Sequence, residues 1–347
     1  MSKRRLSAAL ALAALIAGGA IGALGAGGSA SAGTRSSTTG STTNSTLTQP
    51  VVTVVRTTKT PNKSQPGYHR PTIVVGDMNT PEQFVLGALY SAALSQAGYT
   101  VNITRNIGLP YAAQQSLKDG TVDVYPDYLV AWDHDVAGLK LRYPSVSQAY
   151  AAGARYAKRR GFELLPPTPG SGSDVFGLAV TSQFARQNHL HSMAGLAHEP
   201  LLTYGLPLDF GGLWRAERAY GFKPGLVEPV LTGAQYGALA SGAVQVAYAG
   251  SSDPQLAEPG YTLLADPKHV YGFGNIVPIT TPRAVRVEGP AFVRIIDRVD
   301  ALLTTTALRG LNSEVQLKGH DQTTVAEQFL AGNGLLPPNI YKVVPSG

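Results

Sequence analysis

Apolar and polar positions beyond the first 70 residues follow a pattern that predicts strands separated by helices. Strand-like apolar runs occupy 72–76, 99–104 and 122–125. Between them, apolar residues recur at helical spacing over 81–97 and 112–118, and a glycine follows each helical pattern. Thr80 is the expected N-cap of the first helix, and Pro81 suits its first turn. This β-α-β-α-β order predicts a parallel sheet that binds ligands at the carboxyl ends of its strands.

A second run of the same kind follows, and two amphipathic patterns close the chain. The expected elements are strands over 175–180, 227–231 and 244–248, a helix over 234–241, and amphipathic helices over 290–303 and 323–331. Two such halves in one chain, without a catalytic motif, predict a two-lobed α/β binding protein with a ligand cleft between its lobes.

The first 32 residues have the pattern of an export signal. Lys3, Arg4 and Arg5 precede an apolar run over 6–24, and small residues follow it up to Ala32. This arrangement is typical of a secretory signal peptide, so we expect cleavage after Ala32. The alternative is an uncleaved anchor, because the apolar run is long enough to span a bilayer. In both cases the protein is expected in the periplasm or at the extracellular face of the cytoplasmic membrane.

Residues 33–70 connect this signal to the predicted domain. They are rich in Ser, Thr and Gly, contain Pro50, Pro61 and Pro66, and have little apolar periodicity. Such a segment cannot bury enough apolar surface to offset its ordering entropy, so it is predicted to be a disordered linker. The alternative is an edge strand over 51–55, where the sequence is VVTVV.

Composition and charge exclude several classes of function. The chain has 347 residues and no Cys, which excludes disulfides, thiolate metal sites, a cysteine nucleophile and a lipidated N-terminal cysteine. Eight of its 28 Lys and Arg residues lie within the first 70 positions, where there is no acid, so 20 basic and 22 acidic residues remain in the body. A slightly acidic body gives no reason to expect a nucleic-acid partner.

Few residues suggest chemistry other than binding. Asp123 and Asp127 form a close carboxylate pair near the expected ligand edge, but a glycosidase needs a set separation that a sequence cannot supply. His189 and His191 have no acidic ligand nearby in register. Motifs for a nucleophile elbow, a phosphate loop or a dinucleotide site do not occur. The sequence therefore predicts no enzyme activity, no cofactor and no metal.

Five motifs follow one another along the body of the chain. They are GDMNTPEQ at 76–83, LKDGTVDVYPDY at 117–128, YGALASGAVQV at 236–246 with SSD at 251–253, LLADPK at 263–268, and NIVP at 275–278. In order and spacing they resemble the glycine betaine/choline-type substrate-binding proteins of quaternary-amine ABC importers. The corresponding family motifs include Gly-Ser-Lys-Asn-Phe-Thr-Glu-Gln for the first of them. The resemblance covers most of 72–335.

This resemblance implies a type II-like, two-lobed periplasmic-binding-protein fold that closes on its ligand by a hinge. Lobe one would comprise 72–173 and 282–335, and lobe two would comprise 174–281, with crossovers near Ser173-Asp174 and Thr280-Thr281. The implied function is delivery of a quaternary-amine osmolyte, choline or glycine betaine-like, to an ABC permease by a monomeric protein. The alternative is an exported ligand-sensing or surface-interaction module on the same fold, since the chain has no Cys for a lipid anchor.

The resemblance also implies the ligand-binding residues. A quaternary ammonium group has no N–H to donate and cannot lose its charge, so it is recognised by aromatic faces, which the family supplies from both lobes. Carried over position by position, the site residues would be Tyr128, Asp174, Phe176, Tyr248 and Tyr271. The Tyr271 match is loose, because the family's tyrosine also aligns with Gly274. Without the resemblance, Phe176 and Tyr248 on their apolar strands would be read as core residues.

Three positions that hold a ligand carboxylate in the family differ here. Met78 replaces a lysine, Ala131 replaces a threonine, and the arginine segment is shortened, with Arg215 as its displaced substitute. These replacements would leave a buried carboxylate poorly paired, which is unfavourable. We therefore expect a cation without a tightly held carboxylate, such as choline. We call the aromatic faces that would surround the cation the cage. Trp132 and Trp214 are candidates either for replacement walls of this cage or for plain packing.

Overall fold

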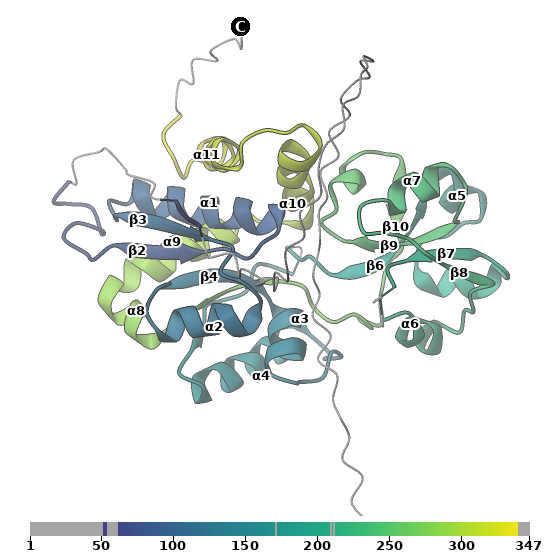
Figure 1. The fold of residues 1–347 in the computed structure, drawn as a ribbon, viewed down its shortest axis with the longest axis horizontal. Helices are drawn as coiled ribbons and strands as arrows, with labels where there is room; N and C mark the ends of the chain where they lie inside the picture. The colour runs from purple at the N-terminus through teal and green to yellow at the C-terminus, as the bar shows by residue number, and fades with distance from the viewer. Residues whose placement is uncertain (1–50, 54–61, 171, 209, 211, 339–347) are drawn as a thin grey trace, which may run out of the picture. The chain divides into compact units, whose positions relative to one another are not determined.

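The computed structural model describes residues 51–53, 62–170, 172–208, 210 and 212–338. Within these residues, the strands form a six-stranded sheet in the order β1-β3-β2-β4-β11-β5 and a five-stranded sheet in the order β10-β6-β9-β7-β8 (Figure 1). The six-stranded sheet with the helices that pack on it is called the first lobe, and the five-stranded sheet with its helices is called the second lobe. Both lobes combine strands and helices, so the predicted α/β class is confirmed.

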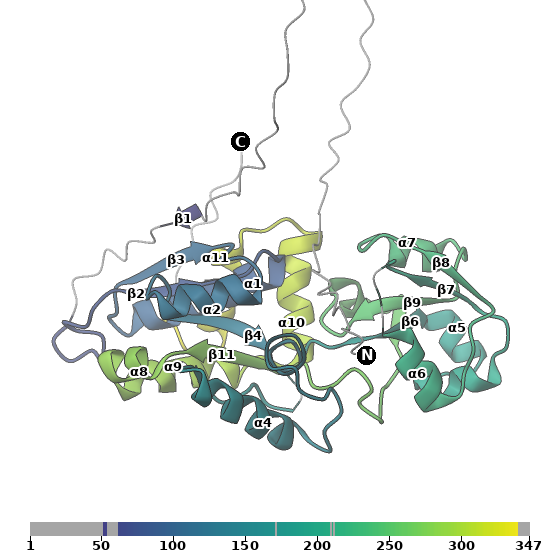
Figure 2. The same ribbon diagram turned by 60° about the horizontal axis from the view of Figure 1, so that its bottom comes forward.

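Parallel pairing organises the centre of the first sheet. Its strands are β1 (Val51–Thr53), β2 (Ile73–Gly76), β3 (Val101–Arg105), β4 (Val124–Tyr128), β5 (Glu163–Leu164) and β11 (Ile276–Thr280). β2 pairs in parallel with both β3 and β4, as the β-α-β-α-β pattern predicted. β11 comes from far along the chain and lies antiparallel beside β4 (Figure 2).

Helices cover both faces of the first sheet. Those of this lobe are α1 (Pro81–Gln96), α2 (Pro110–Lys118), α3 (Leu129–Ala131), α4 (Val146–Arg159), α8 (Pro282–Glu288), α9 (Pro290–Asp300), α10 (Thr305–Asn312) and α11 (Gln322–Gly332). In Figure 1, α1 and α11 lie above the sheet, and α2 and α4 lie below it. π-Helical turns follow α3 at Trp132–Val136 and α10 at Ser313–Leu317.

Strand alternation divides the first lobe into two hydrophobic cores. Val124 and Ile276 pack with α1 and α9 on one face, whereas Tyr125 and Val277 pack with α2 and α4 on the other. Successive side chains of a strand point to opposite faces of its sheet, so each neighbouring pair serves both cores. The carboxyl ends of β2 and β4 are therefore fixed between two packed layers.

The second lobe has the same layered organisation. Its strands are β6 (Phe176–Thr181), β7 (Thr203–Leu206), β8 (Leu226–Pro229), β9 (Val246–Gly250) and β10 (Tyr261–Leu263). Its helices are α5 (Ser182–Gln187), α6 (Leu213–Tyr220) and α7 (Gln235–Ala240), with 3₁₀ turns at Met193–His198 and Pro254–Ala257. β7 pairs in parallel with β8 and β9, whereas β6 is antiparallel to β9. Leu178 and Ala179 on β6 face opposite cores.

The start of α1 is fixed by local chemistry that the sequence predicted. The Thr80 hydroxyl accepts a hydrogen bond from the N–H of Gln83 at 3.3 Å, and Pro81 occupies the first turn. The side chain thus satisfies one of the N–H groups that the first helical turn leaves unpaired. Because β2 ends at Gly76, this cap places the first turn of α1 close to the carboxyl edge of the sheet.

The two segments that join the sheets run side by side. Ser173 and Asn275 form an antiparallel bridge, and the N–H of Asp174 donates to the carbonyl of Gly274 at 2.8 Å. The chain passes from the first sheet to the second between β5 and β6, in the stretch where the first crossover was expected at Ser173-Asp174. The second lies at Gly274-Asn275 rather than near Thr280-Thr281, because β11 already belongs to the first sheet. Strand-like periodicity alone does not reveal which sheet a strand joins.

Part of the predicted linker over 33–70 is structured. Val51–Thr53 pairs antiparallel with β3, which is the alternative that the VVTVV sequence left open. In 62–70, the N–H of Gly67 donates to the carbonyl of Ala97 at 3.1 Å, so this stretch is anchored to the first lobe. The predicted export signal over 1–32 and residues 33–50 lie outside the described residues. In the part of the chain that the structure describes, no helix is both long and apolar enough to cross a membrane.

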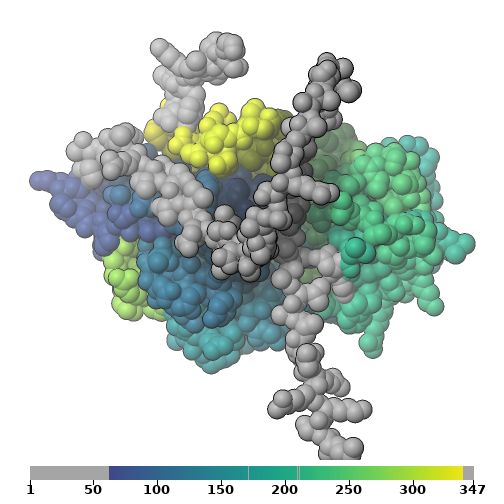
Figure 3. Space-filling model, viewed as in Figure 1, coloured from purple at the N-terminus to yellow at the C-terminus, as the bar shows by residue number. Residues whose placement is uncertain are grey.

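The C-terminal helices contact both lobes. α11, yellow in Figure 3, packs against α1 of the first lobe. α10 contacts α1 and also the 3₁₀ turn at Pro254–Ala257 of the second lobe. The N–H of Ser173 and the hydroxyl of Thr305 on α10 are hydrogen-bonded at 3.1 Å, which ties α10 to the first crossover.

Candidate ligand-binding site

Tyr128 ends β4 at the edge where the parallel strands predicted a ligand site. Its hydroxyl donates a hydrogen bond to Oε1 of Glu82 at 2.5 Å. Glu82 lies in the first turn of α1, so the cap that starts this helix also sets the position of the carboxylate. The sequence singled out Tyr128 but not Glu82, because an acid in a first helical turn is an ordinary capping feature.

The Glu82 carboxylate is buried and bridges the two lobes. Its Oε2 accepts a hydrogen bond from the amide of Asn312 on α10, and the same amide donates to the carbonyl of Ser252 in the second lobe at 3.0 Å. Burial raises the pKa of Glu82 to about 7, and the nearby Asp174 adds to this rise. Hydrogen bonds from Ser252, Tyr128 and Asn312 act on the pKa in the opposite direction.

Asp174 stands at the first crossover and is held by the loop after β9. Its Oδ1 accepts a hydrogen bond from the N–H of Ser252 at 3.1 Å. Burial raises the pKa of Asp174, against hydrogen bonds from Ser252 and Ser251. The charge of Asp174 also contributes to raising the pKa of Tyr128, so the two groups are electrostatically coupled. Asp174 thus connects the Tyr128 side of the site to the second lobe.

Four aromatic rings cluster in the second lobe beside this crossover. The Phe176 ring lies 5.3 Å from the Tyr248 ring and 6.4 Å from the Phe210 ring, centroid to centroid. Phe210 lies 5.0 Å from Tyr248 and 5.9 Å from Tyr271. Phe176 is 41% exposed although it begins an otherwise buried strand. An exposed phenylalanine surrounded by other rings is an available surface for an organic cation.

The structure therefore brings together the three predicted second-lobe aromatics and adds Phe210. Tyr271 is only 4% exposed and its ring packs behind Phe210, so it supports the cluster more than it presents a face. Phe210 lies in the shortened arginine segment, in which the sequence indicated only Arg215 as a candidate ligand residue. Its aromatic side chain was the one sequence signal for a site residue. The hydrophobic pattern gave no indication that the loop holding Phe210 reaches β6 and β9.

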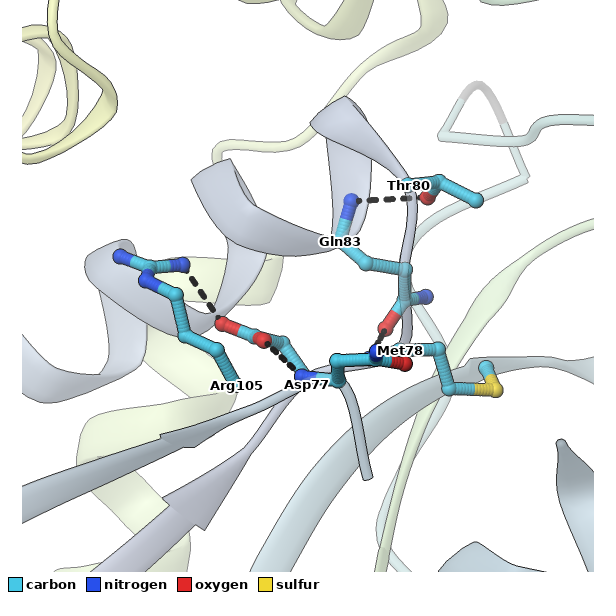
Figure 4. A network of polar contacts seen from close by, with 6 residues as sticks. Asp77, Met78, Thr80, Gln83 and Arg105 are labelled. Atoms are coloured by element: carbon cyan, nitrogen blue, oxygen red, sulfur yellow. Dashed lines mark hydrogen bonds and ion pairs between the residues drawn. The ribbon is translucent and has the colours of Figure 1, made fainter. Parts of the chain in front are cut away.

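The family position occupied by Met78 is uncharged and locally fixed. Its N–H donates to Oε1 of Gln83 at 3.5 Å, and its side chain points away from the Asp77–Arg105 ion pair (Figure 4). Met78 packs against the core below the first sheet. Arg215 lies 5.4 Å over the ring of Trp214. Met78 therefore offers no charge for a ligand carboxylate. Burial raises the pKa of Tyr271 and the charge of Arg215 acts against this rise, so Arg215 is a cation near the edge of the aromatic cluster.

The two tryptophans do not join the aromatic cluster. Trp132 is fully buried, its Nε1 donates to the carbonyl of Gly153 at 3.3 Å, and its ring contacts Phe162 edge-on. Trp132 is therefore a core residue, which agrees with the second of its two interpretations, plain packing. Trp214 is 56% exposed and is paired with Arg215 rather than with Phe176 or Tyr248.

The carboxylate pair noted in the sequence serves the strand itself. Asp123 directly precedes β4, and Asp127 is the next-to-last residue of that strand. Oδ2 of Asp123 accepts the N–H of Val74 at 2.8 Å, whereas Oδ1 of Asp127 accepts the N–H of Tyr128 at 2.8 Å. Among the described residues, no group of three or more His, Asp or Glu side chains could hold a metal ion.

A cavity of about 620 Å³ lies at the opposite edge of the first sheet. It is lined in part by Lys118, Asp123, Arg160 and Arg283. Lys118 and Arg160 stand at the C-terminal ends of α2 and α4, where a cation complements the helix dipole. Helix stabilisation therefore explains Lys118 and Arg160 without a ligand. Arg283 lies in the first turn of α8, and its charge acts on Asp123.

Comparison with known proteins agrees with this geometry. The chain is 25% identical over 289 residues to the glycine-betaine-binding protein of Pseudomonas aeruginosa, covering 76% of this chain and 89% of the relative. It is 25% identical over 282 residues to the carnitine transport binding protein OpuCC of Listeria monocytogenes, covering 77% and 88%.

Solved structures show the same fold. A structure described as a glycine betaine/carnitine/choline ABC transporter matches with a TM-score of 0.70 at 20% identity, covering 77% of this chain and 99% of the other. Apo YehZ from Escherichia coli matches with a TM-score of 0.65 at 21% identity, covering 76% and 99%. The predicted two-lobed substrate-binding fold is thereby confirmed.

The family model for the substrate-binding domain of the ABC-type glycine betaine transport system matches residues 71–332, which is most of the chain. It spans both lobes and both crossovers described above. The match agrees with the resemblance drawn from the five motifs and favours a transport role over a sensing module. The chain therefore belongs to the family of substrate-binding domains of ABC-type glycine betaine transport systems.

Proposed function

We propose that this substrate-binding protein captures a quaternary-ammonium cation without a carboxylate, of the choline type, and delivers it to an ABC permease. It works as a monomer on the outer side of the cytoplasmic membrane and catalyses no reaction. The observation that carries the proposal is the cluster of Phe176, Phe210 and Tyr248 beside Asp174. Tyr128 of the first lobe supplies a further aromatic face, coupled to the cluster through Asp174.

The aromatic cluster suits a cation that cannot donate hydrogen bonds. Each ring face attracts a quaternary ammonium group through its quadrupole by roughly 0.5–2 kcal/mol, more where water is excluded. Phe176, Phe210 and Tyr248 present no permanent charge of their own, so they discriminate by shape and by the ring field. Asp174, two residues before Phe176, adds a formal negative charge close to the same place.

The surroundings of the cluster disfavour a ligand carboxylate. Glu82, Asp174 and Asp253 are acids in one hydrogen-bonded neighbourhood, and burial raises the pKa of all three. A carboxylate brought into this neighbourhood would meet like charges in a low-dielectric environment. Met78 and Ala131 offer no compensating charge at two of the family's three carboxylate positions, and at the third the Arg215 guanidinium stacks on Trp214. A net cation therefore fits this site better than a zwitterion.

Isothermal titration calorimetry of the purified chain with choline, glycine betaine and carnitine tests the proposal. We expect choline to bind at least tenfold more tightly than either zwitterion. At 100 times the dissociation constant, choline should raise the free energy of unfolding by about 2.7 kcal/mol. A betaine or carnitine that binds more than tenfold more tightly than choline would contradict the cation-only site.

A further inference from the structure

Glu82 connects the predicted cage to both lobes through a buried network. Its carboxylate accepts the hydroxyl of Tyr128 and the amide of Asn312. That amide also reaches the carbonyl of Ser252 at 3.0 Å, and the N–H of Ser252 donates to Asp174 at 3.1 Å. Ser252 also forms a side-chain hydrogen bond with Glu82, so this one serine contacts the carboxylates of both Glu82 and Asp174.

A third acid extends this network in the second lobe. Oδ2 of Asp253 accepts the hydroxyl of Tyr236 at 2.7 Å and the N–H of Gly250 at 2.9 Å. Oδ1 of Asp253 and Oδ1 of Asp174 both lie against Gly250, within 2.8 and 3.2 Å of where a Cβ on that glycine would stand. The charge of Asp174 contributes to raising the pKa of Asp253 to about 6, after burial.

Few cations face these acids. The titratable and charged groups around Glu82 and its partners are Tyr128 on β4, Asp174 at the crossover, Asp253 and Tyr236 in the second lobe, and Arg309 on α10. Arg309 donates from Nε to the carbonyl of Ser251 at 2.7 Å. Among the described residues, none of the three carboxylates has a Lys, Arg or His nitrogen within 4 Å. The network therefore holds more acids than cations.

This imbalance has a direct physical consequence. Two neighbouring buried carboxylates without a cation cannot both remain ionised, because each disfavours the charge of the other and burial disfavours both. The empty site therefore retains a proton up to about pH 7, which is the value to which burial raises the pKa of Glu82. A permanent cation placed against Tyr128 supplies the missing positive charge, and ionisation of Glu82 then becomes favourable.

We propose that Glu82 is a specificity-determining residue that exchanges its proton for the charge of a permanent cation, and thereby favours net cations over zwitterions. The inference rests on the proposed function of the cage. The step is a proton transfer from the Glu82 carboxyl group to water or buffer as the cation enters. A zwitterion gains less binding free energy from this exchange, because its own carboxylate faces the same acids.

The first test is calorimetry of the unmodified full chain with choline, repeated at pH 7 in phosphate and in Tris. These buffers differ in ionisation enthalpy, so a difference in the observed heat counts protons released on binding. We expect release of up to one proton, and binding that is about tenfold tighter at pH 8 than at pH 6. Glycine betaine should release fewer protons and show a weaker dependence on pH.

Two matched variants assign the proton. Glu82→Gln keeps the shape of the side chain and removes its titration, so proton release should disappear and the preference for choline over glycine betaine should fall at least tenfold. Glu288→Gln is the control, because Glu288 ends α8 away from the aromatic cluster and burial also raises its pKa to about 7. Glu288→Gln should leave proton release and the preference unchanged.

The outcomes separate this inference from the proposed function. Choline binding without proton release by the unmodified chain overturns the role of Glu82 and leaves the cage intact. Proton release that persists in Glu82→Gln does the same. Absence of choline binding by the unmodified chain would instead contradict the proposed function. Even if Glu82→Gln does not fold, choline binding without proton release by the unmodified chain overturns the inference.

Discussion

The N–H of Asp174 donates a hydrogen bond to the carbonyl of Gly274 at 2.8 Å, so the outgoing and returning crossovers are fastened to each other. Asp174 precedes β6 of the second sheet, and Gly274 precedes β11 of the first sheet. Asp174 is also a candidate ligand residue. The close approach requires a glycine, because a Cβ on Gly274 would stand 1.6 Å from the carbonyl oxygen of Asp174. The family's fourth aromatic side chain therefore cannot occupy position 274 in this structure.

Replacement of Gly274 should damage the crossover. Gly274→Ala places a methyl group against backbone that cannot move aside without breaking the contact, so we expect a loss of at least about 3 kcal/mol in the free energy of unfolding. Gly237→Ala in α7 is the matched control, because its Cβ would meet nothing within 4 Å. That change should stabilise by about 0.5–1 kcal/mol through helix propensity. Equal effects in urea denaturation would contradict the account of the crossover.

Truncation of Phe176 should weaken ligand binding far more than it affects folding. The ring is 41% exposed, so Phe176→Ala should change the free energy of unfolding by less than about 1 kcal/mol. Loss of one cage face should weaken choline binding by about 2- to 30-fold, measured by calorimetry. Trp214→Ala removes another exposed aromatic ring outside the cluster and should change affinity less than about twofold. A larger loss of choline affinity in Trp214→Ala than in Phe176→Ala would place the cage elsewhere.

Two substitutions of Tyr128 should separate its ring from its hydroxyl. Tyr128→Phe keeps the aromatic face but removes the donor to Glu82, so we expect a loss of stability of about 1–3 kcal/mol and a small loss of choline affinity. Tyr128→Ala also removes the face and should weaken binding by at least about tenfold. Titration calorimetry and thermal unfolding of both variants give the comparison. Equal affinities would exclude the ring from the cage.

The buried Asp127 should make folding stability depend on pH. Burial raises the pKa of Asp127 to about 7, so the folded state binds a proton more strongly than the unfolded chain between about pH 4 and pH 7. The free energy of unfolding should therefore fall as the pH rises through this range and stay lower above it.

Asp127→Asn should remove this part of the pH dependence. At pH 8 the variant should be more stable than the unmodified chain by about 1–3 kcal/mol, because it buries no charge. The exposed Asp119→Asn should match the unmodified chain within about 0.5 kcal/mol at every pH. Urea denaturation at pH 5 and pH 8 measures both, and a variant less stable at pH 8 would contradict the prediction.

Periodicity and caps made much of the fold predictable. The alternation around 72–76, Thr80 and Pro81 predicted β2 and the start of α1, and the structure confirmed both. Tyr128 could be placed at a sheet edge because it ends a parallel strand. The location of β11 could not be predicted, since its five residues are all buried and give no indication of the sheet they join.

The site was less predictable because its parts come from distant segments. Phe176 and Tyr248 were named through motif positions, and the structure places their rings 5.3 Å apart. Glu82 and Asn312 were not named as site residues, because they are 230 positions apart and neither stands out from other polar residues in the sequence. Only the return of α10 to the crossover brings them together.

A comparison of choline with its neutral isostere 3,3-dimethyl-1-butanol separates recognition of the positive charge from recognition of shape. The two molecules have nearly the same shape and differ in the permanent positive charge. If the aromatic cluster and its acids recognise a cation, titration calorimetry should show choline binding at least about 100-fold more tightly. Equal affinity for the two, or binding of neither, would contradict a cation-binding site.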